Sequence, residues 1–173
     1  MRLHGKYNTA QVAFLGVYLA VSLILSYIET FIPVVIGVPG IKLGLANLCV
    51  LLILYTFGIP EAILINICRI IISGFLFGNM SMIMYSLAGA LLSFLVMLIF
   101  KKNKLFSIVG VSLLGGVMHN IGQCIVASLA VSDIRVAFYL PILIISGAVT
   151  GYIIGMVCNL IIPKIDRIFH QEG

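Results

Sequence analysis

The chain has 173 residues, of which 62% are hydrophobic and only 9% are charged, and its formal net charge is +5. A soluble domain usually carries about 25% charged residues, so this composition excludes a water-soluble globular protein. The basic residues form no stripe with interleaved aromatic residues, which excludes a nucleic-acid-binding surface. The sequence therefore predicts an all-α integral membrane protein whose surface contacts the lipid bilayer.

Apolar segments near the length that crosses a bilayer, roughly 20 residues, recur along the chain. Gly58 and Pro60 separate the short second segment from the third, because glycine and proline interrupt helices. A single long kinked helix across Gly58 is the alternative, and it leaves five spans. We predict one domain, 1–173, with six membrane helices at about 9–28, 43–57, 61–77, 80–100, 105–131 and 136–162.

The basic residues between these segments indicate how the chain is oriented. With six spans, Lys42 and Arg135 fall on one side of the membrane. The other side carries Arg2, Lys6, Lys101, Lys102, Lys104, Lys164 and Arg167. Because basic loops stay in the cytoplasm, both termini are predicted to be cytoplasmic in a multi-pass protein of the cell membrane.

The chain lacks the motifs of several enzyme classes. It has no Walker A loop, no GxSxG motif and no HExxH pair, and its five acidic residues form no DDxxD-type magnesium site. ATP hydrolysis and magnesium-dependent prenyl transfer by this chain alone are therefore not expected. We also expect no metal site and no cofactor.

The third segment carries polar residues in the middle of a predicted span. Asn66, Arg69 and Ser73 share one helix face because they are three and four residues apart. A charge at this depth costs at least about 3 kcal/mol on insertion scales. Arg69 is therefore expected either to pair with Glu29 or Asp133, or to present its guanidinium to an anionic ligand.

Two further stretches suggest a pocket. In GGVMHNIGQ, residues 115–123, His119 and Gln123 share a face with Asn120 at its edge, and the glycines are expected to leave a cavity there. A structural histidine without a cavity is the alternative. In PGIKLGLAN, residues 39–47, Lys42 and Asn47 lie at the outer end of the second span. Together these residues predict an outward-facing pocket for a small-molecule substrate.

Several stretches resemble a known family across nearly the whole chain. They are PGIKLGLANL, LLILYTFG, EAILINICRIIISGFLFG, HNIGQ and YLPILIISG. They resemble the Gx transporter family, whose members are also labelled heptaprenyl diphosphate synthase component I. That family is similar to the S components of energy-coupling factor (ECF) transporters, which are six-helix substrate-binding membrane proteins. The resemblance implies a transmembrane T component and cytoplasmic ATPases as partners, with Ala13, Gly16 and Ala20 of the first helix contacting the T component.

Three functions remain open from the sequence. The leading hypothesis is a substrate-binding subunit for uptake of a small anionic or amphipathic molecule. Its predicted binding residues are Lys42, Asn47, Asn66, Arg69, His119, Asn120 and Gln123. The second is a non-catalytic membrane subunit that works with a separate prenyl synthase in polyprenyl or quinone metabolism. The third is a structural subunit of a membrane redox assembly.

Overall fold

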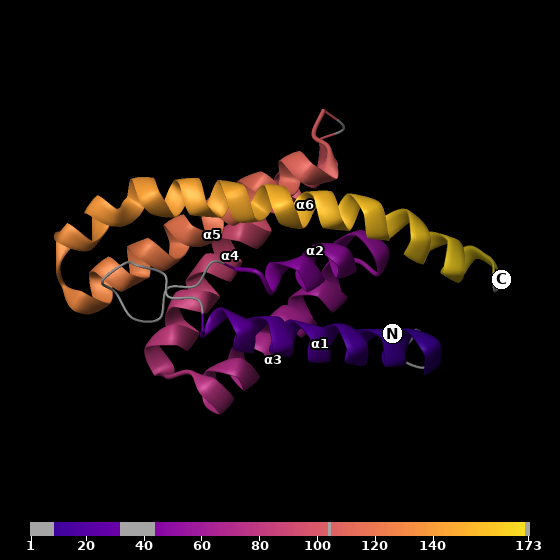
Figure 1. Ribbon diagram of the computed structural model, residues 1–173, viewed down its shortest axis with the longest axis horizontal. Coiled ribbons are helices and arrows are strands. Elements are labelled where there is room, and N and C mark those ends of the chain that lie inside the picture. Colours follow the sequence, from indigo (N-terminus) through magenta and orange to yellow (C-terminus); the bar gives the residue numbers. More distant parts are fainter. Residues whose placement is uncertain (1–8, 32–43, 104, 172–173) are drawn as a thin grey trace, which may run out of the picture.

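The computed structural model describes residues 9–31, 44–103 and 105–171, and within these ranges every regular element is a helix. The prediction of an all-α protein is confirmed. Figure 1 shows the helices as a bundle in which the start of α1 and the end of α6 lie toward the same end. The helices are α1 (Thr9–Glu29), α2 (Asn47–Thr56), α3 (Ile59–Phe77), α4 (Met80–Lys102), α5 (Ile108–Val131), the 3-10 helix η1 (Ile134–Tyr139) and α6 (Leu140–Gln171).

The predicted count of six full-length spans is not confirmed, although the start of α1 and the end of α6 still lie toward the same end of the bundle. In the described part of the chain, five helices are long and apolar enough to cross a membrane, namely α1, α3, α4, α5 and α6. Helix α2 has only 10 residues and is about 15 Å long, which is half of the roughly 30 Å hydrocarbon core of a bilayer. The apolar run 43–57 overestimates this helix because part of it, residues 44–46, forms a turn before the helix begins.

The break between α2 and α3 lies where the sequence predicts it. Gly58 has a φ of 129°, and Pro60 occupies the first turn of α3. Few residues other than glycine adopt that backbone angle, and proline is accepted in the first helical turn because its missing N–H has no intrahelical partner there. The alternative of one long kinked helix is therefore wrong.

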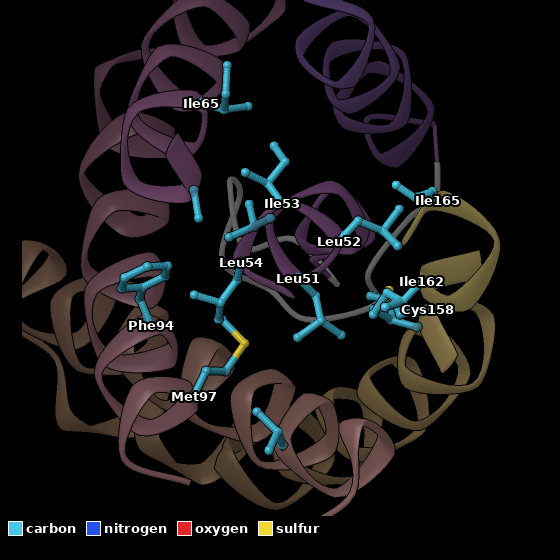
Figure 2. Packing of buried hydrophobic residues seen from close by; sticks show 14 residues of the cluster. Leu51, Leu52, Ile53, Leu54, Ile65, Phe94, Met97, Cys158, Ile162 and Ile165 are labelled. Atoms are coloured by element: carbon cyan, nitrogen blue, oxygen red, sulfur yellow. The ribbon is translucent and has the colours of Figure 1, made fainter. Parts of the chain in front are cut away.

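The main hydrophobic core surrounds α2. Six consecutive residues of this helix, Cys49 to Leu54, are buried, as expected for a helix that is apolar on every side. Figure 2 shows Leu54 beside Met97 of α4, while Leu52 points toward Ile162 and Ile165 near the end of α6. The short helix is thus a buried central element, whereas the longer helices carry exposed apolar side chains on their outer faces.

Close packing of α5 against α6 depends on glycine. A methyl group added to Gly116 would lie 2.3 Å from the Gly147 carbonyl oxygen, and one added to Gly151 would lie 2.6 Å from the Ser112 carbonyl oxygen. The small residues at 147, 151 and 155 therefore serve helix packing inside the bundle. Gly16 on α1 differs, because a methyl group there would meet no atom within 4 Å.

Candidate functional site

Arg69 lies in the interior of the bundle among amide side chains. Only 4% of the residue is exposed. Its Nη2 donates to Asn66 Oδ1 at 2.6 Å and makes a longer contact of 3.5 Å with Asn47 Oδ1, while its Nε has no acceptor among the described residues. A guanidinium has five N–H donors, so two amide oxygens on one nitrogen leave donor capacity on the cation.

Glu29 brings a negative charge to the same region. It ends α1, is 4% exposed, and interacts electrostatically with Arg69. Its Oε1 accepts hydrogen bonds from the backbone N–H groups of Gly44 and Leu45, at 2.5 and 2.6 Å. Two successive backbone N–H groups directed at one carboxylate oxygen form an anion-binding arrangement. The carboxylate therefore ties the end of α1 to the turn that precedes α2.

His119 joins this region from α5. A methyl group on Gly44, whose φ is 89°, would lie 2.8 Å from Asn47 Nδ2 and 3.4 Å from His119 Cδ2. His119 Nε2 and Gln123 Nε2 lie 2.8 Å apart, which confirms that these side chains share a face. The structure thus gathers one buried group, called the Arg69 cluster below. Its members are Glu29, Gly44, Asn47, Asn66, Arg69 and His119.

The other predicted site residues have different positions. Asn120 points toward α6, where its Nδ2 donates to the Leu143 carbonyl at 2.8 Å and to Ser146 Oγ at 3.2 Å. It therefore holds α5 to α6 and does not contact Arg69. Lys42, the predicted rim residue, lies outside the described residues.

Among the described residues, a small enclosed space lies beside Gly115 and Gly116. The space that Gly44, Asn47, Gly115 and Gly116 line has a volume of about 10 Å³, which is room for about one water molecule. Neighbouring helices fill the remaining space: a methyl group on Gly122 would lie 2.7 Å from the Ala88 carbonyl oxygen of α4. These glycines thus allow close helix packing, and a ligand-sized pocket beside them stays a prediction.

Asp133 is not the partner of Arg69. It lies between α5 and η1, and its carboxylate pairs with Arg135 at 2.8 Å. Hydrogen bonds from the side chain and backbone of Arg135 lower the pKa of Asp133 below its usual value. Of the two acids weighed as counter-ions, only Glu29 belongs to the Arg69 cluster.

A second, apolar cavity of about 390 Å³ opens between α3 and α4 and is called the α3–α4 groove below. Its lining residues are Ile63, Asn66, Ile67, Ile70, Leu87, Ala90, Leu91, Phe94, Leu95 and Leu98. Asn66 is the polar residue of this lining and also accepts the hydrogen bond from Arg69. The groove thus connects through one amide side chain to the buried cation.

No pattern in the sequence indicates the groove, because helix packing decides which residues of α3 and α4 face each other. Glycine at position 44 is typical of a helix break, but its place beside His119 follows only from the turn before α2. Among residues 9–31, 44–103 and 105–171 no group of three metal-ligating side chains comes together.

Comparison with known proteins identifies the family. The family model described as heptaprenyl diphosphate synthase component I matches residues 18–161, which cover α1 from its tenth residue to most of α6. No curated protein and no solved structure gives a significant match. The matched range includes the whole Arg69 cluster and the α3–α4 groove. The chain therefore belongs to the heptaprenyl diphosphate synthase component I family.

Proposed function

We propose that this chain is a non-catalytic membrane subunit of a prenyl diphosphate synthase system. In this role it holds the hydrocarbon chain of a polyprenyl compound in the bilayer while a separate subunit carries out the chemistry. The family description supports a component that works beside another one. The acidic residues of the chain, at positions 29, 61, 133, 166 and 172, form no magnesium-binding motif, which assigns the transfer reaction to the partner.

The α3–α4 groove is the observation that carries this proposal. Its volume of about 390 Å³ falls in the range of small-molecule sites, about 300–1,000 Å³. Its lining consists of aliphatic and aromatic side chains apart from Asn66. A branched apolar chain that enters sideways from the lipid would fit this lining without leaving polar groups unsatisfied.

Filling the groove should weaken the binding of an isoprenoid. Ile67→Trp adds bulk at a partly exposed position of the groove lining. We expect it to lower the affinity for geranylgeraniol by about tenfold, which corresponds to about 1.4 kcal/mol of lost contact. Ile71→Trp is the matched control, because Ile71 is similarly exposed on the same helix but is not part of the lining. Equal affinities in the two variants, measured by native mass spectrometry in nanodiscs, would contradict the proposal.

The second candidate function is uptake of a small anionic molecule as the S-like subunit of an ECF-type transporter. The buried Arg69 favours it, because intramembrane cations mark substrate paths in many transporters. Ala13, Gly16 and Ala20 are exposed on α1 and would contact the T component in such a complex. Co-purification distinguishes the candidates: a prenyl synthase subunit supports the first, and a T component with ATPases supports the second.

For the cell membrane, we propose the orientation with both termini in the cytoplasm, as the distribution of basic residues predicts. Single cysteines would be introduced as Asn103→Cys and Ser132→Cys, at exposed positions beyond α4 and α5. The background would have the four native cysteines replaced by alanine. An impermeant maleimide should label position 132 in intact cells and position 103 only after permeabilisation. The reverse pattern would overturn the orientation.

A further inference from the structure

We propose that the Arg69 cluster is a binding site for the oxyanion headgroup of an amphipathic ligand, and that Glu29 occupies the headgroup position in this conformation. This inference relies on the proposed function in one respect, namely that the apolar chain of the ligand occupies the α3–α4 groove. The chemical class is a phosphate or diphosphate ester. Such a headgroup would exchange with the Glu29 carboxylate, so the protein carries its own competing anion.

The first reason is the state of the Arg69 guanidinium. It is 4% exposed, and the side chains that accept from it are two neutral amides on one nitrogen. Its Nε has no acceptor among the described residues. A buried cation is stabilised when its donors are satisfied and its charge is balanced. Free donor capacity at such a cation is what a multi-oxygen anion would use, since guanidinium–phosphate contacts are commonly bidentate.

The second reason is the surroundings of the Glu29 carboxylate. Its Oε1 takes both N–H groups of Gly44 and Leu45, and such converging backbone donors bind phosphates as readily as carboxylates. Asn47 follows Leu45 by two positions in the chain, and its side chain contacts Arg69. The same donors would therefore remain available to an incoming oxyanion once Glu29 withdraws.

The third reason is access from the α3–α4 groove. Asn66 lines the groove and its Oδ1 lies 2.6 Å from Arg69 Nη2. A ligand whose apolar chain fills the groove would thus bring its headgroup to the Asn66 side of the guanidinium. The groove and the Arg69 cluster together match a molecule with a long hydrocarbon chain and an anionic end.

The test compares Glu29→Gln with wild type in nanodiscs of zwitterionic lipid. Glutamine keeps an oxygen for the Gly44 and Leu45 N–H groups but removes the competing charge. The probes are geranylgeranyl diphosphate, uncharged geranylgeraniol and inorganic diphosphate. We expect Glu29→Gln to bind geranylgeranyl diphosphate about tenfold more tightly than wild type, with no change for geranylgeraniol. Arg69→Gln should abolish the advantage of the diphosphate ester over the alcohol.

Glu61→Gln is the matched control, because Glu61 is another buried acid, 6% exposed, at the start of α3. It should leave all affinities unchanged. Tighter binding of inorganic diphosphate by Glu29→Gln would identify a free oxyanion as sufficient, whereas an effect confined to the ester would identify the amphipathic ligand. Both outcomes support the headgroup site.

Two results would overturn it. If Glu29→Gln binds the diphosphate ester no more tightly than wild type, Glu29 is not a competing anion, even when geranylgeraniol still binds in the groove and the proposed function stands. If Glu61→Gln tightens binding equally, the effect is one of net charge. Conversely, tighter diphosphate binding without any geranylgeraniol binding would retain the headgroup site and remove the proposed isoprenoid function.

Discussion

Glu29→Ala is expected to lower the free energy of unfolding by about 2–6 kcal/mol, because two buried backbone N–H groups lose their acceptor at about 1–3 kcal/mol each. The substitution leaves the 4% exposed Arg69 without its acidic neighbour. It also takes away the oxygen that accepts from the Gly44 and Leu45 N–H groups. Thermal melting in detergent, followed by loss of the monodisperse peak in size-exclusion chromatography, measures the effect.

A double variant separates charge from packing. Glu29→Ala combined with Arg69→Met should recover part of the loss, because the double variant no longer buries a cation without its acidic neighbour, whereas the Gly44 and Leu45 N–H groups still lack their acceptor. Asp133→Asn is the control, since Asp133 pairs at the protein surface with Arg135, whose side chain is 81% exposed; exposed pairs contribute little. If Glu29→Ala melts like Asp133→Asn, the Arg69 cluster does not stabilise the fold.

Gly116→Ala is expected to destabilise the protein by at least about 2 kcal/mol through overpacking. The added methyl group would lie 2.3 Å from the Gly147 carbonyl oxygen and 3.1 Å from the Gly151 Cα atom. These are backbone atoms of a packed helix, so α5 and α6 must move apart to admit it. The clash outweighs the gain of about 1 kcal/mol that alanine has over glycine inside a helix.

Gly16→Ala provides the matched control, because it makes the same chemical change at a helical glycine with open space around it. This variant should raise the melting temperature slightly, through helix propensity alone. The two substitutions are thus expected to shift stability in opposite directions. A stabilised Gly116→Ala would mean that α5 and α6 are not in close backbone contact.

Much of the helix arrangement was predictable because it depends on local signals. Hydrophobic length predicted the ends of the long helices to within four residues, except that α6 continues to Gln171 beyond the predicted end at 162. Gly58 with Pro60 predicted the break before α3. The pairing of His119 with Gln123 followed from their spacing of four residues. Each of these properties is set by residues that are close in sequence, so periodicity and turn chemistry are sufficient.

The contacts between helices were not predictable in the same way. Small residues at 115, 116 and 122 are compatible with either a cavity or a close helix contact, and only the positions of α4 and α6 decide between them. The choice of Glu29 over Asp133 as the acid near Arg69 likewise depends on where the end of α1 lies in the bundle. The α3–α4 groove arises from side chains on two helices whose relative rotation the sequence does not specify.

The short α2 also has a consequence for how the protein enters the membrane. Ten apolar residues are too few to be integrated as an independent spanning segment, and α2 is buried on all sides by other helices. Its surroundings are completed by Phe94 and Met97 of α4 and by Ile162 of α6, which are synthesised later. Docking of α2 must therefore be a late assembly step, after the flanking helices are already in the bilayer. Gly44 and Asn47 of the Arg69 cluster lie at the start of α2. The cluster can therefore form only when α2 docks.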